Sequence, residues 1–569
     1  MKSFNFAWRS PYGHIIRLVE ELALSPGLVL DIGCGTAPLA EQLAERGYDY
    51  LGLEIDEDAI VLMTERGIDA RWLDLRKHET LAAEIVELVA GRPVAAILML
   101  DVLEHIPAPN DFLAALRTTT TQLGRPPLLM SVPNATHIDV VAKLAAARWD
   151  MRPSGLLDQT HVGFFGEARL TEMLVGHGWR QIAQNDFSLD PSDQHFPADL
   201  AHIEAQTNLG ALLRALREAA DDHALVNQFV RAYVLLETTP RTPEVDTSPA
   251  PFLSVAMRTT GDREIALLDA LTCLAAQTDP DFEVLLAVHH HDPVRAEFCR
   301  QLVSTFHPSF AFRVRVLEVV GGGRSRPLNA ALDEARGRYL AFLDDDDLVT
   351  GDWVEQFRVG AERRPGRVVR SASADQSHAV RTGPLMPYEP TGPVVVTRPL
   401  LFDALTHYHH NETPICSFAL PIQTLRSLRL RFDESLAVVE DWDLLMRTST
   451  WTGVIDTEVV TSLYRRWDAV EGSLAQHDSQ VWDVAREAVL DRLDAGPVLL
   501  PAGTVRRLAS NAAHYRIEDA TDPRVATLEA QLAAFENSQW WRLTAPMRRV
   551  GTIGRRVARR VARRVARRT

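Results

Sequence analysis

Residues 28–46 join a mostly apolar run to a short loop containing Gly33 and Gly35, and a helical pattern follows that loop. Glycine lets the backbone approach a ligand closely, and the N-terminus of the following helix faces the same point. Short apolar runs and helical stretches keep alternating through residue 237, and a second such series occupies residues 251–470. This alternation is typical of parallel sheets flanked by helices. We therefore predict an α/β protein with two doubly wound domains.

The length and composition of the chain are consistent with this division. Its 569 residues suit about three to four domains, or two large ones with connectors. A hydrophobic content of 46% excludes wholesale disorder. Residues 238–250 hold three prolines and almost no large apolar residue, so we predict a linker between domains at 1–237 and 251–470. From about residue 480 the pattern becomes helical, and we assign residues 471–569 to a helical C-terminal region ending in a basic tail.

Three further features of the sequence indicate where in the cell the protein is located. The sequence lacks an apolar run of about 18 residues, so we expect no transmembrane helix. The first residues lack a secretory signal pattern. The four cysteines are widely spaced and form no Cys-X-X-Cys pair, which favours cytosolic thiols over disulfides or a zinc site. These features together predict a cytoplasmic protein.

Acidic residues mark the ends of four apolar runs in the first series. Asp31 stands at the start of the glycine loop, where a carboxylate suits a cationic or amino-bearing ligand better than a phosphate. Glu54 ends the next run, about twenty residues on, where it can accept both hydroxyls of a ribose. Asp74 follows the third run and is placed to meet an adenine amino group, and Asp101 follows the fourth. An ordinary strand–helix turn is the alternative.

The first region resembles class I S-adenosylmethionine-dependent methyltransferases. The stretch 30–37, LDIGCGTA, matches the first motif of that family, and 101–107, DVLEHIP, matches the motif after the fourth strand. Ala37 departs from the pattern, since the family often has a third glycine there. The resemblance implies a Rossmann-like domain that binds S-adenosylmethionine and transfers its methyl group. The cofactor contacts that it implies are Asp31, Gly33, Gly35, Glu54, Asp74 and Asp101.

The methyl acceptor would lie beside three ionisable side chains. His105, Asp158 and His161 are the candidates to deprotonate a hydroxyl group, because a neutral aliphatic hydroxyl needs a base. The alternative for each is a structural role in which the side chain is simply hydrogen-bonded.

Four consecutive aspartates, residues 344–347, directly follow the apolar run at 339–343. Their mutual repulsion is unfavourable unless a cation or a basic ligand neutralises it. Oxygen ligands at this density suit Mg²⁺ or Mn²⁺, and such ions commonly bridge protein carboxylates to a diphosphate. A solvated acidic turn or a helix N-cap is the alternative.

The second region resembles family 2 glycosyltransferases of the GT-A fold. Its acid cluster matches the Asp-X-Asp motif, and residues 438–447, VVEDWDLLMR, match the acid pair of that family. The resemblance implies a nucleotide-sugar donor, an ion held by Asp344 and Asp346, and single displacement with inversion. Asp441 would be the general base, with Glu440 beside it. The donor contacts that it implies are Thr259, Asp292, Arg324, Asn329 and Asp345.

One departure concerns residues 288–292, VHHHD, where the family usually carries an acidic pair that reads the nucleotide base. Asp292 can substitute from a shifted position, or base recognition is different. The three adjacent histidines cannot easily converge on one ion, which speaks against a metal site there.

The C-terminal tail concentrates positive charge on a chain whose net charge is −16. Eleven arginines and no acidic residue lie between Arg542 and Thr569, after the pair Trp540 and Trp541. Paired tryptophans and basic repeats favour contact with an anionic membrane surface. The alternatives are a disordered or partner-binding tail and a nucleic-acid contact, and the acidic body of the protein speaks against nucleic acid.

These observations predict a bifunctional enzyme of cell-surface polysaccharide biosynthesis, cytoplasmic and peripheral at the inner face of the membrane. One domain would transfer a sugar to a glycan or lipid-linked acceptor, and the other would methylate a sugar hydroxyl. Two alternatives remain open. The second domain can be a glycan-binding module without transfer activity, or the chain can be a membrane-associated assembly scaffold.

Overall fold

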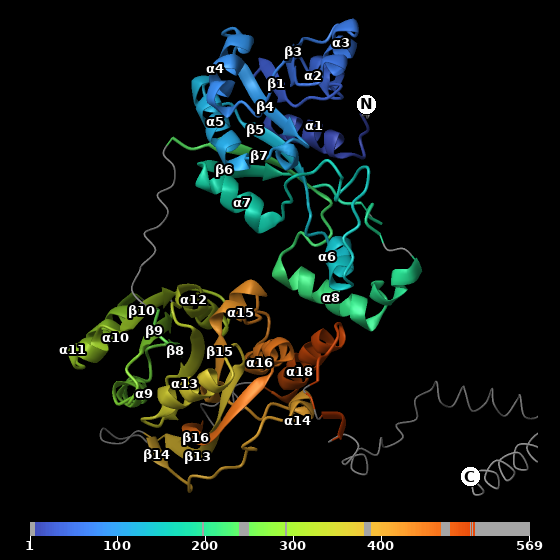
Figure 1. The fold of residues 1–569 in the computed structure, drawn as a ribbon. Coiled ribbons are helices and arrows are strands. Elements are labelled where there is room, and N and C mark those ends of the chain that lie inside the picture. Colours follow the sequence, from blue (N-terminus) through green and yellow to red (C-terminus); the bar gives the residue numbers. More distant parts are fainter. Residues whose placement is uncertain are drawn as a thin grey trace, which may run out of the picture. The chain divides into compact units, whose positions relative to one another are not determined.

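The computed structural model describes residues 6–189, 191–195, 198–237, 250–290, 293–380, 388–467, 478–500, 502 and 504–506. The predictions for Asp292, for nearly all of the linker and for the basic tail lie outside the described residues. Two separate β-sheets organise the chain, one in an N-terminal region (residues 6–237) and one in a central region (residues 250–500) (Figure 1). Within the described ranges, no helix is both long and apolar enough to span a membrane.

The N-terminal region is built on a seven-stranded sheet of order β3-β2-β1-β4-β5-β7-β6. All neighbouring strands pair in parallel except β7, which runs antiparallel to both β5 and β6. The strands are β1 (Leu28–Ile32), β2 (Asp49–Glu54), β3 (Ala70–Trp72), β4 (Val94–Leu100), β5 (Leu128–Pro133), β6 (Trp179–Gln184) and β7 (Gln228–Leu235). The helices are α1 (Pro11–Leu22), α2 (Ala40–Glu45), α3 (Glu57–Glu65), α4 (His78–Val89), α5 (Pro109–Gln122), α6 (Ile138–Ala145), α7 (Glu167–Gly176) and α8 (Asn208–Ala220), with 3₁₀ turns η1 (Leu103–His105) and η2 (Ala198–Ile203).

Helices cover both faces of this sheet, so the central strand β1 is buried along its whole length. Leu28 and Leu30 point to one face and pack in a cluster with residues of α4, α5 and α7. Val29 points to the other face and packs with residues of α1 and α2. Successive side chains of a strand alternate between faces, so an almost continuously apolar run is required where both faces are covered.

The central region is built on a larger mixed sheet of order β10-β9-β8-β11-β15-β13-β16-β12, with β14 paired to β13. Its strands β8 to β11 are parallel, and β15 is antiparallel to β11 and β13. The strands are β8 (Leu253–Thr259), β9 (Phe282–His289), β10 (Val314–Val319), β11 (Tyr339–Asp344), β12 (Leu348–Val349), β13 (Val368–Val380), β14 (Tyr388–Pro390), β15 (Phe418–Pro421) and β16 (Val454–Trp467). The helices are α9 (Glu264–Ala275), α10 (Pro293–Ser304), α11 (Pro308–Ala311), α12 (Arg326–Glu334), α13 (Trp353–Arg363), α14 (Ala404–His409), α15 (Ile422–Ser427), α16 (Glu440–Thr452) and α18 (Ser479–Asp494), with a 3₁₀ turn η3 (Ile415–Ser417).

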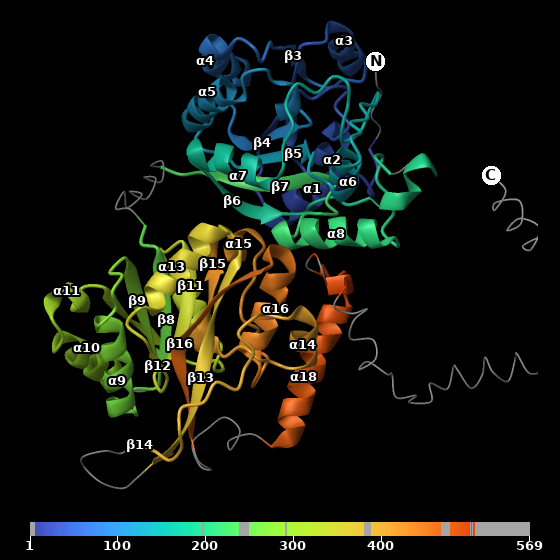
Figure 2. The same cartoon turned by 60° about the horizontal axis from the view of Figure 1, so that its bottom comes forward.

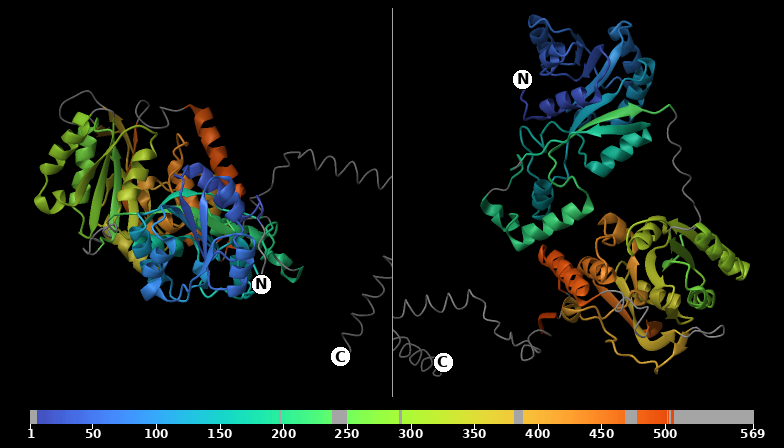
Figure 3. Two further views of the ribbon diagram at one scale, coloured as in Figure 1. Left: turned by 90° about the horizontal axis from the view of Figure 1, so that it is seen from above. Right: turned by 180° about the vertical axis from the view of Figure 1, so that it is seen from behind.

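Two apolar clusters lie on opposite faces of the second sheet. Leu253 and Val255 of β8 pack with residues of α9, α10 and α13, whereas Ala256 packs with residues of α12, α15 and α16. Figure 2 shows α9 and α10 beside β8 and β9, and Figure 3 gives two further views of both sheets. Helix α18 packs through Val489 against Trp442 of α16. The prediction of two doubly wound α/β domains is therefore confirmed.

Candidate active sites

Asp31 is held at the C-terminal end of β1 with one carboxylate oxygen uncompensated. The hydroxyl of Tyr50 donates a hydrogen bond of 2.7 Å to Asp31 Oδ2. Asp31 Oδ1 has no hydrogen-bond partner among the residues that the structure describes, and the side chain is only 2% exposed. Burial raises the pKa of Asp31 to about 6, against the lowering effect of the Tyr50 hydrogen bond. An unpartnered buried oxygen beside a glycine loop suits a protonated amine as ligand.

The loop after β1 depends on backbone angles that favour glycine. Gly33 has φ 71° and Gly35 has φ 55°, and Ala37 adopts φ 54° as well. A Cβ atom on Gly33 would lie 2.6 Å from Cγ2 of Val102, so no side chain fits there. The backbone N–H of Gly35 donates a 2.7 Å hydrogen bond to Glu54 Oε2, which brings the predicted ribose acid to the loop. The loop and Glu54 therefore border the same site.

Asp74 and Asp101 have partners within the chain. Arg76 donates to both carboxylate oxygens of Asp74, at 2.8 and 2.9 Å, and these bonds lower the pKa of Asp74 to about 2. Asp101 Oδ1 accepts from Ser131 Oγ at 2.9 Å and from the side-chain amide of Gln228. The cofactor contacts expected of these two aspartates stay predictions.

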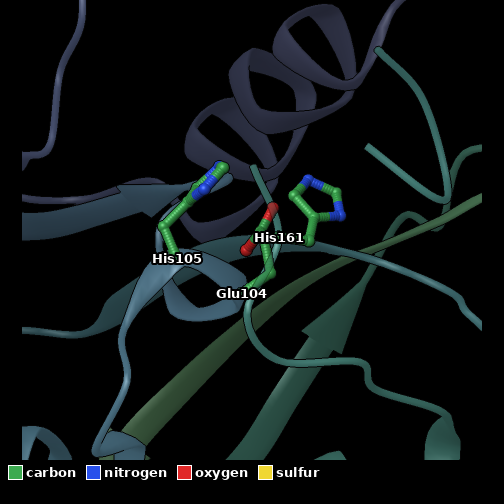
Figure 4. A group of neighbouring side chains, drawn as sticks. All are labelled: Glu104, His105 and His161. Atoms are coloured by element: carbon green, nitrogen blue, oxygen red, sulfur yellow. The ribbon is translucent and has the colours of Figure 1, made fainter. Parts of the chain in front are cut away.

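His105 and His161 come together in the structure, and their expected role as bases stays a prediction. Their ring centroids are 4.9 Å apart, and Figure 4 shows the carboxylate of Glu104 between them. Asp158 Oδ1 accepts hydrogen bonds from the backbone N–H and the hydroxyl of Thr160, at 2.9 and 2.8 Å. This bonding is the structural alternative considered for Asp158. Glu104, which is adjacent to His105 in the motif, was not among the predicted site residues.

A cavity of about 1360 Å³ lies in the central region and gathers most residues predicted for its site. The cavity lies at the C-terminal ends of β8 and β11 and at the N-terminus of α16, where parallel strands of α/β folds commonly bind ligands. The predicted residues that line it are Thr259, Arg324, Asp344, Asp345, Asp346, Glu440 and Asp441.

Arginines neutralise the acid cluster. Arg258 donates to both oxygens of Asp344, at 2.7 and 2.8 Å, and also to Glu440 Oε1 at 2.8 Å. Arg263 donates to Asp345 Oδ1 at 2.6 Å and pairs with Asp346. The sequence predicted that a cation or a basic ligand neutralises this cluster, and the two arginines of the chain that do so were not predicted. Their position close to Thr259, at the end of the neighbouring strand, was the available signal.

The two acidic residues at the start of α16 differ in the hydrogen-bond donors that their carboxylates meet. Glu440 is 2% exposed, and its Oε1 accepts from both Arg258 and Arg324, each at 2.8 Å. Asp441 accepts from the backbone N–H of Trp442 at 2.7 Å and from the side-chain amide of Asn411 at 3.3 Å. Burial, and then the neighbouring Glu440, raise the pKa of Asp441 to about 6. A carboxylate with that pKa can act as a base near neutral pH.

The side chain of Asn329 makes hydrogen bonds within the protein. Its amide donates to the Phe432 carbonyl and to Glu434 Oε1, both at 3.0 Å, and its oxygen accepts from the Phe432 N–H. These bonds fasten α12 to residues 432–434, so a donor contact by Asn329 stays a prediction.

The two aspartates predicted to hold a divalent ion, Asp344 and Asp346, both have arginine partners in the structure. Both oxygens of Asp344 accept from Arg258. Asp346 Oδ2 accepts hydrogen bonds from Arg263 and from Trp467 Nε1. Mg²⁺ commonly takes one or two carboxylates and completes its shell with substrate phosphates. Ion binding by Asp344 and Asp346 therefore stays a prediction.

Family models match both regions of the chain. The model described as "Methyltransferase domain" matches residues 8–184. The model described as "Glycosyl transferase family 2" matches residues 254–375. The two matches fall on the regions of the first and second sheet.

Curated proteins match each region separately. The uncharacterized glycosyltransferase EpsJ of Bacillus subtilis is 28% identical over 177 residues, covering 30% of this chain and 49% of that protein. The succinoglycan biosynthesis protein ExoM of Rhizobium meliloti is 33% identical over 95 residues, 16% of this chain and 29% of that protein. A ubiquinone biosynthesis O-methyltransferase of Pseudomonas entomophila is 30% identical over 100 residues, 17% of this chain and 40% of that protein. The chain thus spans half or less of the length of each relative.

Proposed function

Since the chain carries a methyltransferase domain and a family 2 glycosyltransferase domain, we propose that it is a bifunctional enzyme of cell-surface polysaccharide biosynthesis. It transfers a sugar from a nucleotide-sugar donor to a glycan or lipid-linked acceptor, and it methylates a sugar hydroxyl with S-adenosylmethionine. ExoM, a succinoglycan biosynthesis protein, and EpsJ support the polysaccharide context. The tail, with its eleven arginines, supports association with an anionic membrane surface.

The observation that carries the glycosyl transfer is the cavity that combines Asp441 with the aspartate cluster. Asp441 removes the proton of the acceptor hydroxyl, whose oxygen attacks the anomeric carbon while the nucleotide departs from the opposite face. The configuration at that carbon is therefore inverted. Arg324 supplies positive charge near the departing diphosphate, and Asp346 would hold a divalent ion that neutralises it further.

The observation that supports the methyl transfer is the unpartnered oxygen of buried Asp31 beside the glycine loop. Asp31 receives the amino group of the cofactor, and Glu54, which borders the loop, receives the ribose hydroxyls. Holding the methyl group in line with the acceptor oxygen supplies much of the acceleration. The acceptor approaches from the side of Asp101 and His161.

A direct test uses the purified full chain with a panel of nucleotide sugars, S-adenosylmethionine and glycan or lipid-linked acceptors. Mass spectrometry of the product should show the mass of one sugar plus one methyl group. Asp346→Ala should abolish sugar transfer and leave methylation of a preformed glycan intact. Absence of both mass increments with every donor and acceptor would contradict the proposal.

A second candidate is supported by the full pairing of Asp344 with Arg258. In this alternative the central domain binds glycans without transferring sugar, and only the methyltransferase is active. Nucleotide release from the donor panel in the presence of Mn²⁺ separates the two candidates, because a binding module releases none.

A further inference from the structure

Three possible metal ligands converge at the end of β4 in the N-terminal region. Glu104 and His105 belong to the 3₁₀ turn η1, and His161 comes from the loop between α6 and α7. One ligand atom of each residue lies within 4.8 Å of the others. In Figure 4 the Glu104 carboxylate faces the space between the two imidazole rings. Nitrogen and oxygen atoms at these separations can contact one ion after small side-chain movements.

Glu104 is a buried carboxylate without compensation. Its side chain is 1% exposed, and neither carboxylate oxygen has a hydrogen-bond partner in the described part of the chain. Asp101 and Asp158 lie near enough to act on its charge. Burying an unpaired carboxylate is costly, and nearby acids increase that cost. A cation at this point would offset it.

The two histidines are fixed by contacts around them. His105 Nδ1 lies 3.1 Å from the carbonyl oxygen of Thr160, which only accepts, so Nδ1 carries the proton and Nε2 has its lone pair available. Metal-binding histidines almost always donate their second ring nitrogen in this way. The N–H groups of Val162 and Gly163 donate to the Glu104 carbonyl, each at 2.9 Å. The loop that carries His161 is thus fastened to the turn that carries the other two residues.

We propose that Glu104, His105 and His161 bind a divalent transition-metal ion in the methyltransferase domain. Two imidazoles and one carboxylate are a ligand set that suits Zn²⁺ and related ions, and three protein ligands leave at least one position open. The site is separate from Asp346 and from every cofactor contact predicted for this domain except its neighbour Asp101.

The role of this site rests on the proposed methyl transfer. An acceptor hydroxyl bound in the open position loses its proton more easily, because a metal ion lowers the pKa of a bound oxygen. The proton passes to water at the exposed edge of His105. The oxygen then forms a bond to the methyl carbon as the carbon–sulfur bond breaks, and its electron pair stays on sulfur. His105 and His161 then serve as ligands instead of the general bases that the sequence suggested.

The binding test uses the full chain carrying Asp346→Asn, so that the other candidate ion site is removed. The chain is stripped with a chelator and titrated with Co²⁺, whose visible absorption reports ligation by imidazole. We expect one ion per chain, with an affinity at least about 100-fold lower in Glu104→Gln and in His161→Ala. His202→Ala, an exposed histidine of η2, is the matched control and should bind normally. Binding of S-adenosylhomocysteine verifies that each variant is folded.

Failure of this inference is distinguishable from failure of the proposed function. Unchanged Co²⁺ affinity in both ligand variants, or no binding by the Asp346→Asn chain, would overturn the site. Methyl transfer that continues at full rate in chelator would overturn its role and leave the methyltransferase proposal intact. Tight binding without any methyl transfer would support the site and count against the proposed function.

Discussion

The pH dependence of sugar transfer is the sharpest test of the role assigned to Asp441. Burial beside Glu440 raises the pKa of Asp441 from 3.8 to about 6. A base must be deprotonated, so the single-turnover rate should rise about tenfold per pH unit below pH 6 and level off above it. At pH 5 the rate should be about a tenth of the plateau, whereas a carboxyl group with the ordinary pKa would already be near its maximum.

The raised pKa of Asp441 also determines how the free energy of unfolding changes with pH. Because the folded-state pKa is raised, the native state binds the proton more tightly than the unfolded state. The free energy of unfolding should therefore fall as pH rises from about 4 to about 6, by at most about 3 kcal/mol. Asp441→Asn removes this penalty, so at pH 7 the variant should be as stable as the native chain or more stable. It should lose about 10²- to 10⁴-fold in transfer rate.

The assay is quench-flow sugar transfer with saturating donor between pH 4.5 and 8, combined with urea denaturation of both chains. Donor binding, measured by calorimetry, should be similar in the native chain and in Asp441→Asn, because the carboxylate acts on the acceptor. A rate midpoint near pH 4, or an Asn variant that keeps more than about a tenth of the native rate, would refute the reasoning.

Three further predictions concern the remaining site residues. Asp31→Asn should weaken S-adenosylhomocysteine binding by about 1.5–3 kcal/mol, because a charge-assisted hydrogen bond is lost, and calorimetry measures this directly. Gly33→Ala should lower the free energy of unfolding by at least about 1–2 kcal/mol, because Gly33 has a positive φ and an added Cβ would lie too close to Val102. In the same urea titration, the control Gly176→Ala in α7 should raise the free energy of unfolding slightly. A chelator should lower sugar transfer at least about 100-fold, with recovery on adding Mn²⁺ in the native chain and none in Asp346→Asn; full activity in chelator would count against the ion.

The location of both candidate sites could be predicted from the sequence because it follows from strand order. Glu54 ends β2 and Asp344 ends β11, and parallel strands bring such ends to one edge. Thr259 and Asp441 are far apart in sequence, yet both line the cavity. The order of the motifs was enough to predict that these residues lie together, because each motif follows an apolar run that can be recognised in the sequence.

The partners of the acids could not be predicted in the same way. Arg258 meets Asp344 because β8 and β11 pair in a register that places the two residues side by side. It reaches Glu440 because α16 begins at that point. Likewise, Glu104 meets His161 through a loop held by two backbone hydrogen bonds across more than fifty residues. Register and long-range loop contacts leave no local pattern in a sequence.

The reversed direction of β7 sets the point at which the chain leaves the first sheet. Tyr233, near the end of β7, lies beside Leu128 at the start of β5, so β7 ends at the edge of the sheet opposite to the cofactor loop. Leu253 opens β8, whose far end carries Thr259 at the cavity. The chain therefore leaves the first sheet opposite to its cofactor loop and enters the second sheet opposite to its cavity. Each candidate site therefore lies at the end of its own sheet that is opposite to the strand end through which the chain leaves or enters that sheet.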